Sequence, residues 1–180
     1  SSEYKNTFLE PKIIGTSIGI QYIDGKFNKE INKNSKDITE RIRFIKNIPQ
    51  SLAIKNRLEI KGILYEDENI SNEKDESVLF GIQNSKPKLK RSRFCAFQIF
   101  HCNINHFQSL QELKNLNFEI PQTQFTNFIS DIEIYLQCWK EGKLFKNYPT
   151  NGLVLKINSR KLQKHLGESN QSIHWAYAIH

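Results

Sequence analysis

Hydrophobic and polar positions alternate with a period of two in several stretches of the chain, and this period predicts β-strands. Residues 18–22 alternate in this way, Asp24 and Gly25 follow, and a second run extends over residues 27–31. An Asp-Gly pair between two such runs is typical of a β-hairpin. The segment LEPKIIG just before them places Lys12 at the start of the hairpin's first strand. Further strands are predicted over residues 57–67, 93–101, 152–157 and 173–179.

A period of three to four residues predicts helices elsewhere. Ile38, Ile42 and Ile45 share one helical face, and Asp37 with Glu40 three residues later makes a capping box at its start. Three more helices are predicted, over residues 107–116, over 128–139 with Gly142 beyond its end, and between Ser159 and Gly167. Strands and helices follow one another without regular βαβ alternation, so the predicted class is α+β, with antiparallel sheets and flanking helices.

Composition and charge narrow the class of protein. The 180 residues suit a single domain, and the formal charge of +7 with a pI near 9.3 favours polyanionic partners. The three cysteines fall in no paired CxxC spacing, so neither a disulfide framework nor a zinc site is indicated and a reducing cytoplasm is expected. No apolar run approaches the roughly 20 residues of a membrane span, and no export leader begins the chain. Methionine is absent even from the first position, which indicates a piece of a longer protein.

A dense basic run, KPKLKRSR, leads into the strand predicted over residues 93–101. Its cations could contact DNA phosphates without regard to sequence, or could form a solvated loop; both readings stay open. These cations are Lys86, Lys88, Lys90, Arg91 and Arg93. The strand that follows is apolar on both parities, which is not expected of an exposed edge. The chain has no Gly-rich phosphate loop, so a nucleotide site would be built from side chains on strands.

Five segments occur in the order EPKIIG, LEIKGILY, FCAFQIF, NGLVLKIN and HWAYAI. Together they resemble the successive nucleotidyltransferase motifs of the adenylation domain of NAD-dependent DNA ligases. The resemblance covers nearly all 180 residues, and it implies the nucleotidyltransferase fold over residues 1–180 as one domain of a longer multidomain ligase. It also implies NAD as the AMP donor, Mg²⁺ as a cofactor, nicked double-stranded DNA as the substrate and a role in replication and repair. A monomer is expected, in the cytoplasm and associated with the nucleoid if the host is bacterial.

The resemblance assigns roles to particular residues. Lys12 aligns with the lysine whose amine attacks the α-phosphorus of NAD and becomes linked to AMP. Lys156 aligns with the lysine of the fourth motif and would offset charge on the α-phosphate. Glu59 would contact the AMP ribose or a metal, and Glu10 would face the adenine or nicotinamide side of the cofactor. Either glutamate could instead be a solvated strand residue.

Four other residues are assigned to the nucleotide site. Lys29 and Lys143 correspond in sequence to two arginines of the family. A lysine cannot reproduce the bidentate hydrogen bonds that an arginine makes to phosphate. Trp175 lies in a motif whose strand flanks the nucleotide. His180 replaces the closing lysine of the fifth motif and would be a weaker, pH-dependent cation facing phosphate.

Several acids of the family's motifs are replaced. Ile14 and Ile63 stand where the family has carboxylates, and Asn151 stands where it has an aspartate. Fewer acids weaken the expected Mg²⁺ site, whose ligands remain unassigned. Two hypotheses therefore stay open: an active adenylation domain, and a catalytically impaired ligase-like module that binds DNA or a protein.

Overall fold

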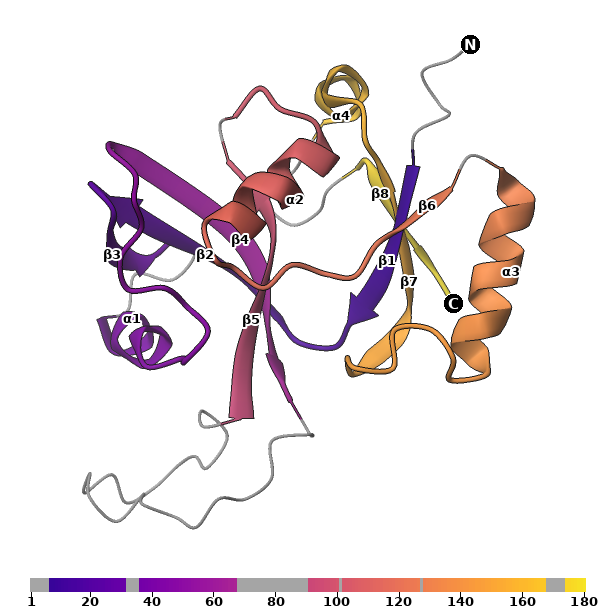
Figure 1. The fold of residues 1–180 in the computed structure, drawn as a ribbon, viewed down its shortest axis with the longest axis horizontal. Helices are drawn as coiled ribbons and strands as arrows, with labels where there is room; N and C mark the ends of the chain where they lie inside the picture. Colours follow the sequence, from indigo (N-terminus) through magenta and orange to yellow (C-terminus); the bar gives the residue numbers. More distant parts are fainter. Residues whose placement is uncertain (1–6, 32–35, 68–90, 101, 127, 168–173) are drawn as a thin grey trace.

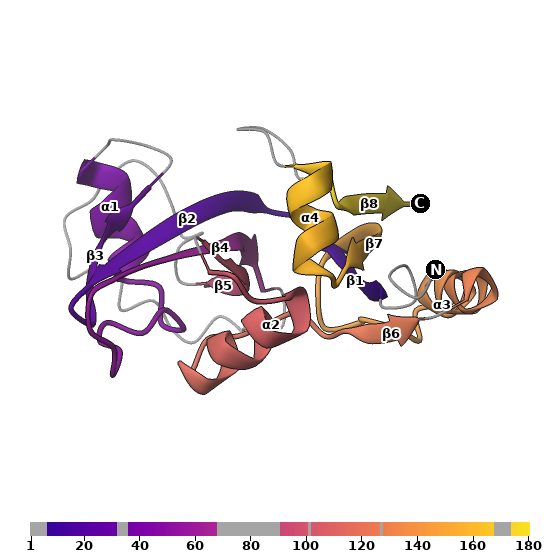
Figure 2. The same cartoon turned by 90° about the horizontal axis from the view of Figure 1, so that it is seen from above.

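Two four-stranded antiparallel sheets form the frame of the protein (Figure 1). The computed structural model describes residues 7–31, 36–67, 91–100, 102–126, 128–167 and 174–180. Sheet A has the strand order β6-β1-β7-β8, and sheet B has the order β3-β2-β4-β5. Seen from above, sheet B occupies the left of the molecule and sheet A the right (Figure 2).

The strands of sheet A are β1 (Thr7–Ile13), β6 (Gln124–Thr126), β7 (Thr150–Ile157) and β8 (Ala176–Ile179). Those of sheet B are β2 (Thr16–Ile23), β3 (Lys26–Glu30), β4 (Arg57–Glu66) and β5 (Ser92–Ile99). The helices are α1 (Lys36–Arg43), α2 (His106–Asn115), α3 (Ile129–Lys140) and α4 (Arg160–Leu166). None of the helices in the described ranges combines the length and the apolarity that crossing a membrane would take.

The predicted hairpin is confirmed as β2 and β3, and its turn has the expected chemistry. Asp24 and Gly25 have φ values of 47° and 77°, the left-handed pair that a two-residue hairpin turn requires. The placement of Lys12 at the start of this hairpin was wrong. Lys12 lies on β1, a separate strand in the other sheet, and the chain passes from sheet A to sheet B at Ile14 and Gly15.

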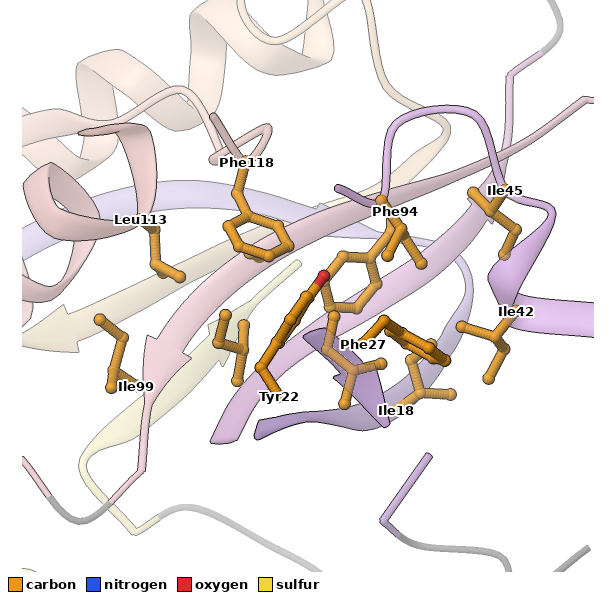
Figure 3. Packing of buried hydrophobic residues seen from close by; sticks show 13 residues of the cluster. Ile18, Tyr22, Phe27, Ile42, Ile45, Phe94, Ile99, Leu113 and Phe118 are labelled. Carbon is orange, nitrogen blue, oxygen red and sulfur yellow. The ribbon is translucent and has the colours of Figure 1, made fainter. Parts of the chain in front are cut away.

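The main hydrophobic core lies on one face of sheet B, where α1 and α2 supply apolar side chains (Figure 3). Tyr22 and Phe94 are fully buried at its centre, and Phe118 packs edge-on against both rings. A smaller core joins sheet A to the segment around α3, with Leu9 and Leu153 buried beneath it. Because helices cover these two faces, the opposite faces of the sheets are left to meet each other.

The ends of α3 and α4 agree with the sequence signals, whereas the predicted start of the first helix was wrong: α1 begins at Lys36, one residue before the expected cap Asp37. Asn105 caps α2, and its side chain forms a capping box with Gln108. Gly142 follows α3 with φ 68° and donates its N–H to the carbonyl of Trp139, as predicted for the residue beyond the helix end. Ser159 and Gly167 bound α4, also as predicted.

The apolar strand β5 is an edge strand of sheet B, but its outer side is covered. The N–H of Phe94 donates to the side chain of Asn47, that of Ala96 to the carbonyl of Glu119, and that of Ile99 to Ser109. Long apolar strands at open edges template unwanted pairing, and these three hydrogen bonds remove that risk here.

Candidate active site

The centre of the candidate site is a buried carboxylate on β1. Glu10 is 1% exposed. Its Oε2 lies 2.5 Å from Lys156 Nζ on β7, and its Oε1 lies 2.5 Å from His106 Nε2 at the first residue of α2. Burial by itself raises the pKa of Glu10, but Lys156 and His106 outweigh that effect and lower it to about 2. The carboxylate is therefore ionised at neutral pH and holds Lys156 beside it.

Strand register explains why these side chains meet. β1 and β7 are antiparallel, with Phe8 opposite Lys156 and Glu10 opposite Val154. Glu10 and Lys156 are therefore diagonal neighbours on one face of sheet A. His106 reaches them because the start of α2 is fastened to the segment after β7: the N–H of His106 donates to the carbonyl of Asn158.

His106 was missed at the sequence level, although a signal for it exists. It stands at the beginning of the apolar stripe that continues through Leu110 and Leu113, all three of which are buried. A polar residue on the buried stripe of an amphipathic helix needs a partner, and here the partner is Glu10. The pattern could have flagged His106 but could not have named a partner 96 residues away.

Lys156 also links the two sheets. Its Nζ lies 4.4 Å from the centroid of the Phe97 ring on β5, which is cation–π geometry. Phe97 is only half-buried and lies outside the main core, whereas its neighbour Phe94 is central to that core. A second contact between the sheets is the small cluster of Ile13, Tyr65 and Cys95. The faces that carry Lys156 and Phe97 thus approach each other across the site.

Lys12 stands two residues beyond Glu10, where the pairing of β1 with β7 shifts register between Pro11 and Ile13. Such bulges often redirect a side chain. Lys12 Nζ lies 3.1 Å from Nε2 of His180, next after the last residue of β8, and His180 Nδ1 lies 2.9 Å from the backbone carbonyl oxygen of Asn151. The structure thus brings together the predicted nucleophile and the residue predicted to be a phosphate-facing cation. The sequence pattern did not predict a ring nitrogen within hydrogen-bonding distance of the Lys12 amine.

Glu59 and Lys29 lie on sheet B. The carboxylate of Glu59 is buried, accepts from Gln21 Nε2 at 2.9 Å, and forms an ion pair with Arg57. Lys29 pairs opposite Gln21 in the strand register and is exposed. Lys29, Gln21 and Glu59 therefore form one row across β3, β2 and β4.

Two further predicted residues, Lys143 and Trp175, make contacts with residues other than Lys12. Lys143, beyond the end of α3, is exposed and pairs with Glu141 at 2.6 Å. Trp175 is 1% exposed and packs with Ile157 and Leu162, its ring 5.9 Å from that of His106. The prediction that Trp175 helps to bind the nucleotide does not fit this burial, because a covered ring cannot stack on a ligand. Trp175 instead backs His106.

The basic run is described only in part. Lys86, Lys88 and Lys90 lie outside the described residues. Arg91 is half-buried just before β5. Arg93 forms a 2.6 Å ion pair with Glu119 and lies 3.8 Å from Asp67, so its guanidinium is engaged within the fold.

A magnesium site built from these side chains does not fit the structure. Across the described ranges no cluster of three or more His, Cys, Asp or Glu side chains is arranged to hold a metal ion. The two candidate carboxylates, Glu10 and Glu59, are each taken up by cationic side chains.

The cluster as a whole combines an amine, a neighbouring imidazole acceptor, a buried cation and an aromatic ring. This is a set that can bind an anionic, ring-containing molecule and attack it. The profile of the NAD-dependent DNA ligase adenylation domain matches residues 83–180, which is more than half of the chain. The chain belongs to the NAD-dependent DNA ligase adenylation domain family.

Relatives in this family support the match over almost the whole sequence. The DNA ligase of Metamycoplasma arthritidis is 30% identical over 96% of this chain, and that of Prochlorococcus marinus strain NATL2A is 29% identical over 99%. The alignments cover 30% and 33% of those ligases, so the chain spans about a third of the length of the relatives it matches.

Solved ligase structures share the fold. The ATP-dependent DNA ligase of bacteriophage T7, in complex with ATP, superposes with a TM-score of 0.57 at 10% identity, covering 86% of this chain and 57% of that one. A structure from a study of DNA binding by Lig E DNA ligases gives a TM-score of 0.53 at 16% identity, covering 87% of this chain and 57% of that one. The predicted α+β nucleotidyltransferase fold is confirmed.

Proposed function

We propose that residues 1–180 form a single adenylation domain in which Lys12 is the nucleophile. The Lys12 amine attacks the α-phosphorus of NAD, nicotinamide mononucleotide leaves, and AMP remains on the lysine through a phosphoramide bond. AMP then passes to the 5′ phosphate of nicked DNA, and the 3′ hydroxyl displaces it to close the strand. The observation that carries this proposal is the position of the Lys12 amine. It lies 3.1 Å from Nε2 of His180, and Lys12 follows Glu10, which pairs with the buried Lys156, by two residues along β1.

The other residues take roles that follow from their surroundings. Glu10 stays ionised and holds the Lys156 amine beside it, and a cation next to the α-phosphate stabilises the charge that builds there during attack. The half-buried Phe97 ring under Lys156 offers an aromatic face to the adenine. On sheet B, we assign a phosphate contact to the exposed Lys29 and a ribose contact to Glu59, which accepts a hydrogen bond from Gln21.

The test of the nucleophile is adduct formation. The full chain would be mixed with NAD labelled in its AMP half, and covalent label would be measured after denaturation. Lys12→Ala should abolish the adduct, because it removes the attacking amine. Lys26→Ala, which removes an exposed strand lysine at the far end of sheet B, is the matched control and should form adduct like the parent. Label that survives in Lys12→Ala, in a protein shown to be folded by circular dichroism, would refute the assignment.

A second candidate function is a ligase-like module that binds DNA or a protein without forming the adduct. It is favoured by the engagement of both Glu10 and Glu59 in internal ion pairs and by the apolar Ile14 and Ile63 at acidic positions of the family. The same experiment separates the two: a folded parent protein that binds DNA but takes up no label would establish the module.

A further inference from the structure

His180 makes two hydrogen bonds that fix the position of its proton. Its Nδ1 lies 2.9 Å from the backbone carbonyl oxygen of Asn151, and a carbonyl oxygen can only accept, so Nδ1 carries the hydrogen. Its Nε2 lies 3.1 Å from Lys12 Nζ, a group that only donates when charged. A doubly protonated ring would set two cationic donors against each other. The ring is therefore neutral, with the lone pair of Nε2 aimed at the Lys12 ammonium.

We propose that His180 is the general base that activates Lys12, an inference that rests on the proposed function. Nε2 takes a proton from the Lys12 ammonium, and the resulting imidazolium keeps its Nδ1–H bond to Asn151. The freed electron pair of Nζ forms the N–P bond, and the bond from the α-phosphorus to the bridging oxygen breaks. Its electrons leave with nicotinamide mononucleotide, whose phosphate takes the second proton that Nζ loses as the phosphoramide forms. When AMP moves on to the DNA phosphate, the N–P bond breaks, and Nζ regains one proton from the imidazolium and one from solvent.

The charged groups near the His180 ring indicate that Lys12 is the group whose proton His180 takes. On β1 and β7, the strands packed nearest, Glu10 and Lys156 are bonded to each other. Tyr177 on β8 alternates to the other side of the strand. Among the residues that the structure describes, Lys12 is the one charged side chain that hydrogen-bonds to His180. Asn151 keeps the ring oriented, as the partner of a catalytic histidine commonly does.

The two possible roles of His180 predict opposite pH dependences. A base must be unprotonated, so the rate of adduct formation should rise with pH through the range in which imidazoles lose their charge, about pH 5 to 8, and then level off. A phosphate-facing cation, the role expected from the sequence, would instead make the rate fall over that range, against the rise that deprotonation of Lys12 itself causes. The difference in slope between the parent and His180→Ala therefore distinguishes the base from the cation.

The experiment measures the single-turnover rate of adduct formation from labelled NAD between pH 5.5 and 9 in the full chain. The proteins are the parent, His180→Ala, His180→Lys and the control His165→Ala, which removes an exposed histidine of α4. The parent and His165→Ala should show the same rise. Both His180 variants should be slower at pH 7.5 by about 10²-fold, the usual contribution of a general base, and should lose the rise. Added imidazole should restore the rate of His180→Ala in proportion to the fraction of the imidazole that is neutral. A merely structural role of His180 would not explain such a rescue.

Failure of the base and failure of the proposed function give different results. Adduct that forms with a parent rate falling as pH rises, or with His180→Ala matching the parent, overturns the base and leaves Lys12 as nucleophile. A parent that forms no adduct overturns both. Nitrogen-15 chemical shifts of His180 need no NAD: a hydrogen on Nδ1 is expected, and a neutral ring protonated at Nε2 overturns the base on its own.

Discussion

At the scale of single residues, Glu10 decides the character of the site. A carboxylate taken out of water is costly unless it is paired and hydrogen-bonded, and Glu10 meets both conditions through Lys156 and His106. The pairing works in both directions, because Lys156 is only 7% exposed and equally needs a counter-charge. Glu10, which the resemblance places at the nucleotide, is thus engaged with two buried side chains of the fold.

Glu10→Gln should destabilise the protein by roughly 3–5 kcal/mol, because it leaves the Lys156 ammonium buried without its carboxylate. Urea denaturation at pH 7 measures this loss as a lower midpoint. The matched control is Glu141→Gln, which breaks an exposed pair with Lys143 and should leave the midpoint where it is. Equal midpoints for all three proteins would mean that the buried pair contributes no stability.

The same pair predicts a pH dependence of stability. The pKa of Glu10 is lowered in the folded protein from 4.5 to about 2, so its contribution is fully present above pH 4.5 and is lost as the pH falls toward 2. The parent should therefore lose stability over that window more steeply than Glu10→Gln. Parallel curves for the two proteins would contradict the lowered pKa.

At the scale of elements, the junction of β7 and β8 positions His180. Gly152 has φ 140°, and a Cβ built there would lie 2.4 Å from the carbonyl oxygen of Ile179 and 3.1 Å from Nδ1 of His180. No side chain fits between the two strands at this point. The close approach at Gly152 is what lets Asn151 accept the hydrogen bond from the His180 ring.

Gly152→Ala should therefore lower both thermal stability and the rate of adduct formation. Gly142→Ala is the matched control: it also has a positive φ, 68°, but nothing lies within 4 Å of its Cβ position. Both variants lose about 1–2 kcal/mol through the left-handed backbone, and only Gly152→Ala adds the clash. Calorimetry and the labelled-NAD assay measure the two effects. A Gly142→Ala rate as low as that of Gly152→Ala would remove the strand junction from the explanation.

Elements whose signals are local were predictable from the sequence, and contacts between distant elements were not. The hairpin turn at Asp24 and Gly25 and the caps of α2, α3 and α4 depend on residues a few positions apart. The three-residue β6 shows no period, and β1 was merged with the hairpin because no pattern marks the change of sheet at Ile14. The Lys12–His180 contact joins residues 168 positions apart, so its acceptor character could be found only from geometry.

At the scale of the whole molecule, the excess of positive charge matters more than any single cation. The formal charge of +7 attracts a polyanion, and each phosphate contact releases counterions and makes binding weaken with salt. Net charge alone does not say which cations touch DNA. Arg93 is engaged by Glu119, which also accepts from Tyr65 and Asn47, so this arginine holds β5 to the segment before β6.

Lys88→Ala should therefore change DNA binding but not stability, and Arg93→Ala should change stability but not DNA binding. Lys88, which lies outside the described residues, keeps its predicted role as a phosphate contact. Its removal should reduce the slope of log affinity against log salt by about 1, with an unchanged denaturation midpoint. Removal of Arg93 should leave the salt slope as it is and lower the midpoint, because Glu119 loses its ion pair. Nicked duplex DNA titrated at four salt concentrations, with a urea curve for each protein, measures both quantities. A reduced salt slope in Arg93→Ala at full stability would place that arginine on the DNA instead of in the fold.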